Sequence, residues 1–302
     1  PPPPFSFVVD DALKVPAMQP FTLTAATVGD LVPDVVMVEV GESRYRMERV
    51  GPSFQHTFPL VREDISFRLT GGGVASSTYR LVALPVPTLV GLEVTTTPPA
   101  YTGLPSETLV DIGNLRVPEG TIIEWAVRST DTDSLRIVAP GQPSPVLQGA
   151  AGVFTSTLRA TASGPYWLVP TNQAVGALDS LRYYLQVLAD QPPRISASER
   201  IDSTAQSIRY FNGEVSDDYG FSRLTFAYQW LEMGERPEEL LVAETPGLNT
   251  TTRIPMDAPS GRSDRFFFEW SLAELGIVQG DVLEYWFEVW DNDRIHGPKM
   301  AR

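Results

Sequence analysis

The 302-residue sequence contains no cysteine and only two histidines, His56 and His296. Without cysteine, the chain cannot form the inter-sheet disulfide of antibody-type domains, and thiol chemistry is excluded. Neither histidine has a Cys, His or carboxylate neighbour at the spacing of a zinc site. The Gly-x-Ser-x-Gly motif of serine hydrolases is also missing. The sequence therefore predicts that the protein is not an enzyme.

Basic residues and long apolar runs are scarce as well. The formal net charge is −14, and Lys14 and Lys299 are the only lysines. Nucleic-acid binding needs a basic face that neutralises phosphates, so neither a nucleic acid nor an anionic membrane surface is an expected partner. No run of 18 apolar residues exists, so this fragment is not expected to insert into a membrane. The chain starts without a methionine or a signal-like segment, and we expect any anchor to lie outside it.

The sequence is rich in turn residues that separate short β-type runs. Its 27 prolines and 23 glycines alternate with runs of Val, Thr, Tyr, Phe and Trp. The segments Tyr79–Pro85 and Tyr183–Ala189 resemble each other about 100 positions apart, and a third aromatic run, Leu283–Trp290, follows after one more period. This repeat predicts an all-β fold of three tandem immunoglobulin-like or fibronectin-III-like β-sandwiches.

The repeat also predicts the division of the chain. Residues 1–4 would form a proline-rich lead-in, followed by sandwiches at 5–87, 88–190 and 191–302, the last strand lying in 297–302 or being cut off. Both joints are expected to be short and stiff, because prolines lie at residues 85 and 87 in the first and at residues 192 and 193 in the second. The period of two places Trp125 in the core of the second domain and Phe226 in the core of the third.

Five acidic residues form the best candidate for a ligand site. Asp217 and Asp218 lie in a turn, Asp291 and Asp293 follow the last aromatic run, and Asp190 lies in the second joint. If these loops meet at one domain boundary, their oxygens suit calcium, which takes 6 to 8 oxygen ligands. The alternative is that each aspartate bonds its own backbone in a turn. No other cofactor is expected.

Two tryptophans are candidates for a contact with a partner. Trp286 and Trp290 alternate with Tyr285, Phe287 and Val289, so they face outward if those residues face the core. Exposed aromatics on a sandwich can bind a protein or a glycan. Partial burial beneath a neighbouring loop is the alternative.

Four motifs together resemble a bacterial envelope family of unknown function: Pro99–Gly103, Val117–Thr121 with Trp125, Asp217–Ser222 and Asp291–Asp293. The resemblance covers the second and third domains, and the first mainly by architecture. It implies a larger protein with hydrophobic transmembrane helices near its N-terminus, several immunoglobulin-like modules outside the cytoplasmic membrane, and a long helical region after them. It implies no catalytic residues, because the family has no established activity.

We therefore expect a non-catalytic spacer and protein-interaction region, located in the periplasm and tethered to the membrane through segments outside this chain. An envelope protein is the expected partner. Two alternatives remain open: a carbohydrate-binding or adhesive surface array that uses Trp286 and Trp290, and an accessory region of an enzyme whose catalytic domain lies elsewhere.

Overall fold

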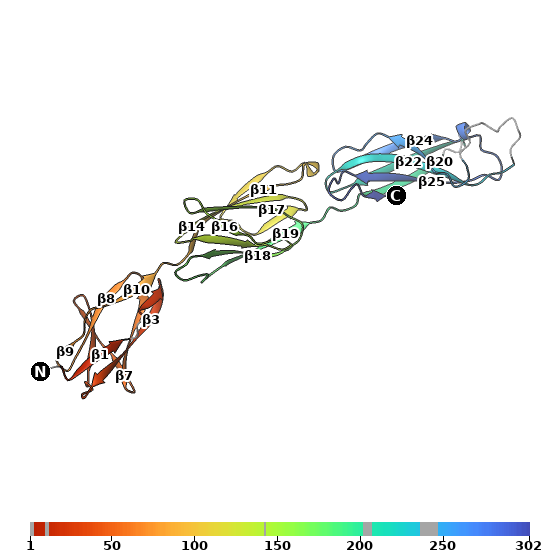
Figure 1. Ribbon diagram of the computed structural model, residues 1–302. Coiled ribbons are helices and arrows are strands. Elements are labelled where there is room, and N and C mark those ends of the chain that lie inside the picture. Colours follow the sequence, from red (N-terminus) through yellow and green to blue (C-terminus); the bar gives the residue numbers. More distant parts are fainter. Residues whose placement is uncertain (1–2, 10–11, 142, 202–206, 236–246) are drawn as a thin grey trace.

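The computed structural model describes residues 3–9, 12–141, 143–201, 207–235 and 247–302. Within these ranges the chain forms β-strands and short 3-10 turns but no α-helix. The strands pair into six sheets, two for each of three β-sandwiches that follow one another in an elongated row (Figure 1). The predicted all-β fold of tandem sandwiches is confirmed. Pro1 and Pro2 of the expected lead-in lie outside the described residues.

The first domain encloses a core of phenylalanine, valine and leucine side chains between two sheets. One sheet has the order β1-β3-β7-β6 and the other β2-β10-β8-β4-β5, with β9 paired to β8. Residues 65–67 of β8 pair with 79–81 of β10, and the glycines at 71–73 close the short hairpin between β8 and β9. The strands are β1 (Phe5–Val9), β2 (Lys14–Pro16), β3 (Gln19–Gly29), β4 (Val36–Val40), β5 (Ser43–Arg46), β6 (Glu48–Val50), β7 (Ser53–Val61), β8 (Ile65–Gly71), β9 (Val74–Ala75) and β10 (Tyr79–Leu84).

The second domain repeats this topology, with sheets β12-β11-β14-β17 and β13-β19-β18-β15-β16. In both domains an early strand pairs in parallel with the last one, β2 with β10 and β13 with β19. The two similar segments at residues 79–85 and 183–189 therefore occupy equivalent positions. The strands are β11 (Thr88–Thr97), β12 (Glu107–Val110), β13 (Leu115–Pro118), β14 (Ile122–Thr130), β15 (Ser134–Val138), β16 (Val146–Gln148), β17 (Val153–Arg159), β18 (Gly164–Thr171) and β19 (Leu181–Leu188).

The third domain packs sheet β20-β21-β24 against sheet β23-β22-β25-β26. Phe226 lies at its centre, with ring centroids 4.6 Å from Phe268 and 4.8 Å from Trp270. The aromatic strand β25 is next to last, because β26 pairs with its end at Val289 and Trp290. The strands are β20 (Arg194–Ile201), β21 (Ile208–Ser216), β22 (Phe221–Glu232), β23 (Thr252–Met256), β24 (Ser263–Ser271), β25 (Val282–Asp291) and β26 (Met300–Ala301).

Trp125 anchors the core of the second domain, as its place in the alternating run predicts. Ile123, Trp125 and Val127 of β14 are all buried. The indole packs against Tyr166, whose hydroxyl accepts a hydrogen bond from Trp125 Nε1 (3.5 Å) and donates one to the carbonyl of Gly113. Burial raises the pKa of Tyr166 to about 12, so the hydroxyl stays protonated and remains a donor at neutral pH.

We expect Tyr166→Phe to destabilise the second domain by about 1–3 kcal/mol, because the Gly113 carbonyl would lose its buried donor. Denaturant unfolding followed by tryptophan fluorescence measures this loss. Tyr184→Phe is the matched control, since Tyr184 is 49% exposed. Equal stability of the two variants would contradict a stabilising role for the buried hydroxyl.

Candidate functional site

The second joint, between the second and third domains, gathers the acidic side chains identified in the sequence. The linker Ala189–Pro193 joins β19 to β20. Its Gln191 backbone amide donates to Asp218 Oδ2 in the β21–β22 turn (3.3 Å). Its Asp190 pairs with Lys299, which lies in the segment after β25. These contacts bring three separate parts of the chain together at one domain boundary.

Lys299 lies among three buried carboxylates. Its Nζ donates to Asp293 Oδ2 (2.8 Å) and to Asp190 Oδ2, and it is 3.6 Å from Asp291 Oδ2. The three aspartates are at most 8% exposed. The structure therefore places an ammonium group inside the predicted acidic cluster, a role that sequence analysis did not assign to Lys299.

The aspartates also bond the backbone of their own loops, as the alternative interpretation expects. Asp217 Oδ2 accepts from the amides of Tyr219 (2.9 Å) and Gly220 (2.7 Å). Asp293 Oδ1 accepts from the amide of Ile295 (2.7 Å), and Asp291 Oδ1 from that of Lys299 (2.8 Å). Hydrogen bonds within the turns thus account for one carboxylate oxygen of each of these three aspartates. They do not account for the second oxygen.

The cluster carries unusual electrostatics. Burial raises the pKa of Asp190 to about 6 against the opposing effect of Lys299, and the carboxylates of Asp218 and Asp291 add to the rise. Burial likewise raises the pKa of Asp217. At Asp293 burial acts in the same direction, but the hydrogen bonds from Lys299 and from the Ile295 and His296 amides, together with the charge of Lys299, outweigh it and lower the pKa. Lys299 and the loop amides therefore jointly favour the ionised form of Asp293, whereas the pKa values of Asp190 and Asp217 stay raised.

Asn292 and Tyr101, which sequence analysis gave no role in the joint, tie the third domain to the second. Asn292 Nδ2 donates to the carbonyl of Tyr101 (3.0 Å) and to that of Tyr219 (3.2 Å). The rings of Tyr101 and Tyr219 meet edge to face at 5.8 Å. Tyr101 belongs to the 3-10 turn Ala100–Thr102 of the second domain. Both residues lie within the motifs that carry the family resemblance, which is the signal that could have identified them.

A close apolar contact completes the joint. Gly120 has a φ of +81°, and a Cβ at this position would lie 2.1 Å from Cδ1 of Ile295. Next to it, His296 Nε2 is 3.4 Å from Glu119 Oε1. The left-handed φ favours glycine at residue 120, and the absence of a Cβ there lets the Ile295 side chain approach the second domain.

We expect Gly120→Ala to push the segment 292–299 away from the second domain. Hydrogen exchange of the Asn292 and Lys299 amides should become faster. The Asn292 amide donates to the carbonyl of Gly220 and the Lys299 amide donates to Asp291 Oδ1, and both bonds would be strained by this movement. Adding Ile295→Ala should reverse only part of this increase, because it removes the clash but leaves the backbone strain at residue 120 and the loss of the isoleucine contact. Unchanged exchange in the single variant would show that the contact does not hold the joint.

The first joint is built differently. Asn172 of the second domain donates from Nδ2 to the carbonyl of Pro85 (2.9 Å) and, within its own domain, to the carbonyl of Asp131 (2.8 Å). Asp133 accepts from the Gln173 amide. An open cleft of about 630 Å³ lies beside this contact. Asp131 and Asp133 thus act as turn residues here.

Trp286 and Trp290 lie on the outer face of β25, as predicted, and both are half-buried. The guanidinium of Arg223 lies 3.8 Å from the ring centroid of Trp290, and that of Arg302 lies 5.8 Å from that of Trp286. Arginine side chains therefore contact both rings. This arrangement leaves less ring surface for a ligand than the alternation alone suggests.

Between the two tryptophans, Glu288 is a buried carboxylate with a full set of partners. It is 3% exposed and accepts from Arg253 Nε (2.8 Å) and Nη2 (3.1 Å) and from Trp286 Nε1 (2.9 Å). Burial raises the pKa of Glu288, but the hydrogen bonds from Arg253 and Trp286 outweigh it, and the pKa lies below its usual value.

Because the folded-state pKa is lowered, Glu288 stabilises the third domain above the carboxyl pKa of the unfolded chain, about 4.3, and this contribution is lost as pH falls through the folded pKa. We expect Arg253→Met to cost about 1–2 kcal/mol at pH 7, since it leaves the buried carboxylate without its cation. Urea unfolding at pH 7 and pH 3 tests this. The penalty should shrink at pH 3, and a penalty independent of pH would contradict the assignment.

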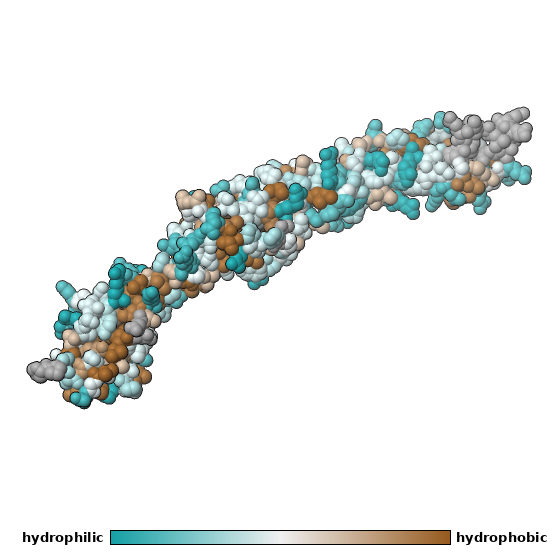
Figure 2. Space-filling model, in the orientation of Figure 1, coloured by the Kyte–Doolittle hydropathy of each residue, from teal (hydrophilic) through white to brown (hydrophobic). Residues whose placement is uncertain are grey.

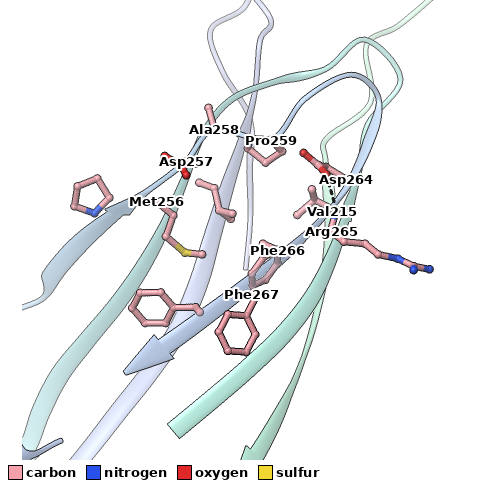
Figure 3. A pocket seen from close by; sticks show the side chains of 12 residues that line it. Val215, Met256, Asp257, Ala258, Pro259, Asp264, Arg265, Phe266 and Phe267 are labelled. Carbon is pink, nitrogen blue, oxygen red and sulfur yellow. Dashed lines mark hydrogen bonds between the residues drawn. The ribbon is translucent and has the colours of Figure 1, made fainter. Parts of the chain in front are cut away.

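An open cleft of about 450 Å³ lies at the edge of the third domain (Figure 3). Met256 and Phe266 form part of its apolar lining, and Asp264 lies at its rim. Asp264 Oδ2 accepts from the Ser260 amide (2.7 Å), and such hydrogen bonds lower its pKa. The carboxylate is therefore ionised and already engaged, which does not suit it to general acid catalysis.

Each of the two histidines contacts other side chains. His56 stacks on Tyr45 with ring centroids 5.2 Å apart and contacts Phe58 edge to face. His296 lies 3.6 Å from Asp293, a carboxylate neighbour that its sequence spacing did not suggest. In the part of the chain that the structure describes, no group of three or more His, Cys, Asp or Glu side chains has the arrangement of a metal site.

Comparison with known proteins identifies a family. A family model described as "Domain of unknown function (DUF4175)" matches residues 76–271. Three solved structures show low similarity. The fibronectin(III)-like modules of Clostridium thermocellum CbhA are 10% identical over 61% of this chain and 94% of theirs, with a TM-score of 0.31. The ICAM-5 D1-D4 ectodomain fragment is 12% identical over 89% of this chain and 77% of its own, with a TM-score of 0.35. Escherichia coli alpha-2-macroglobulin is 8% identical, with a TM-score of 0.26, and the chain spans 22% of its length.

No curated protein matches the chain. The resemblance to a family of unknown function is confirmed, whereas the transmembrane helices that it implied are not shown. Among the described residues, no helix has the length and apolar character needed to cross a membrane.

Proposed function

Because the chain belongs to the family described as "Domain of unknown function (DUF4175)", to which no activity is attached, we propose its function from geometry: a non-catalytic spacer and protein-interaction region of a membrane-anchored bacterial envelope protein. It would lie in the periplasm, tethered through segments outside this chain. The observation that carries this proposal is the row of sandwiches with a closely packed second joint.

A spacer must hold its domains apart, and the second joint does so through several interactions. An interdomain hydrogen bond, a buried ion pair and the contact of Ile295 with Gly120 act together. The linkers themselves are short and contain proline, which limits independent motion of the domains. These features favour a semi-rigid rod.

We expect small-angle X-ray scattering of the chain to give the profile of an elongated particle, with a maximum dimension close to that of the row in Figure 1. A variant with Ile295→Ala and Tyr101→Ala should give a broader distribution of distances, because it loses two of the contacts at the second joint. A compact particle would refute the spacer role.

The interaction part of the proposal concerns the end of the row that carries the N-terminus. Four apolar residues in and beside the loop after β3 are between 41% and 61% exposed: Val28, Leu31, Val32 and Val35. We call them the apolar tip. On the face shown in Figure 2, hydrophobic residues gather most clearly on the first domain. Exposed apolar clusters of this kind favour contact with another protein.

Crosslinking in cells, followed by recovery of the full-length protein from the envelope fraction and mass spectrometry, tests this role. We expect a reproducible envelope partner that is lost when Leu31→Ser and Val32→Ser are combined. Val146→Ser is the matched control, because Val146 is 54% exposed on the second domain. Equal recovery with all variants would leave only the spacer role.

A glycan-binding surface built on Trp286 and Trp290 is less favoured. Sugars stack on open aromatic faces, whereas the Arg223 guanidinium lies directly over Trp290.

A further inference from the structure

Several oxygens at the second joint are buried without a hydrogen-bond partner. They are Asp190 Oδ1, Asp217 Oδ1, Asp218 Oδ1, Asp291 Oδ2 and Asn292 Oδ1. Asp190 and Asp291 are 8% and 0% exposed, so their oxygens are well removed from solvent. A buried carboxylate oxygen that is left unbonded costs the free energy of its lost hydration. Four carboxylate oxygens and one amide oxygen in this state at one boundary favour a ligand that binds there.

These oxygens belong to neighbouring residues. The carboxylates of Asp218 and Asp291 act on Asp190 and also on Asp217. The Asn292 amide donates to the carbonyl of Gly220, and Phe221 pairs with Asp291 across the β22–β25 ladder. The linker, the β21–β22 turn and the start of the segment after β25 therefore present oxygens to a common region.

The carboxylates of the cluster outnumber the ammonium group of Lys299. Asp190, Asp217, Asp218, Asp291 and Asp293 supply five carboxylates, and Lys299 bonds Asp190 and Asp293 and lies 3.6 Å from Asp291 Oδ2. Lys299 uses Oδ2 of Asp190 and leaves Oδ1 free. Paired carboxylates in a buried site disfavour each other's ionisation unless positive charge is supplied. A divalent cation beside Lys299 would supply it.

We propose that the second joint binds calcium through Asp190, Asp217, Asp218, Asp291 and Asn292. All the proposed ligand atoms are oxygens, and they come from a linker, a turn and a strand end, which suits the variable 6- to 8-fold coordination of calcium better than the rigid octahedron of magnesium. The side chains do not already stand in a closed metal arrangement, so the ion would draw the unbonded oxygens inward.

This set differs from the five aspartates expected from the sequence. Asp293 is excluded, because its Oδ2 bonds Lys299 and its Oδ1 accepts from the amides of Ile295 and His296. Asn292 takes its place: its Nδ2 is held by Tyr101 and Tyr219, while its Oδ1 is unbonded. The asparagine thus links the proposed ion to the second domain.

Bound calcium would stiffen the joint. The ion would connect the linker at Asp190 to the turn at Asp218 and to Asn292, whose other end contacts the second domain. The site does not depend on the spacer role, because its test measures metal binding directly.

Terbium is a suitable probe, because tyrosine transfers excitation energy to it at short range and Tyr101 and Tyr219 lie beside the acidic cluster. We expect terbium emission on tyrosine excitation of the 302-residue chain, displaced by calcium but not by equal magnesium. Calcium at about a hundredfold its Kd should raise the Tm of the third domain by about 10 °C over a chelator.

Asp218→Ala should lower calcium affinity at least about tenfold, since it removes a charged ligand. Its matched control, Asp281→Ala, removes an aspartate of the same domain that precedes β25, at the opposite end of that strand from Asp291, and whose oxygens accept from the Gly234 and Val278 amides. It should leave affinity unchanged. Asp190→Asn provides a second variant that retains an oxygen for Lys299.

Identical melting in calcium and chelator, together with no displaceable terbium emission, would overturn the proposal. So would calcium binding that appears only in Lys299→Met, because Lys299 would then be the resident cation of the natural protein.

Discussion

A carboxylate removed from water needs a partner for each oxygen, and the second joint is organised around this requirement. Backbone amides of the turns satisfy one oxygen of Asp217, Asp291 and Asp293, which also shapes the loops that carry them. Lys299 then crosses to the linker and bonds Asp190. The position of the third domain against the second follows from these bonds, because they connect residues from both sides of the boundary.

Much of the fold could be predicted from the sequence, because burial between two sheets imposes a period of two on each strand. In β14 and β22 this pattern identified the core residues Trp125 and Phe226 correctly. The two similar segments form β10 and β19. These are the last strands of the first and second domains, and each pairs in parallel with an early strand of its own domain. The strand β9 could not be predicted, since two residues are too few to show an alternating pattern.

The site could be predicted only in part. Aspartates in turns can be identified from short stretches of sequence, and their positions at the ends of predicted strands indicated that they would lie close together. The partners of those aspartates were not visible, because Lys299 reaches Asp190 across 109 positions and Asn292 reaches Tyr101 across 191. The arginines that contact Trp286 and Trp290 were not predicted for the same reason. Arg223 lies on a neighbouring strand, and the alternation within one strand does not show which residue of the next strand lies beside it.

The two joints impose different mechanical properties on one row. At the second joint, Lys299 and Asn292 come from the segment that follows β25, so the joint is complete only when the last part of the third domain has folded. Folding of that domain and stiffness of the joint are therefore coupled. At the first joint, the Asn172 side chain bonds the Pro85 carbonyl beside an open cleft. An exposed hydrogen bond of this kind contributes about 1 kcal/mol, so any bending of the rod would be easier there than at the ion-paired second joint. The second and third domains would then move as one body, and the first domain, which carries the apolar tip, would change direction only as far as the short proline-containing linker allows.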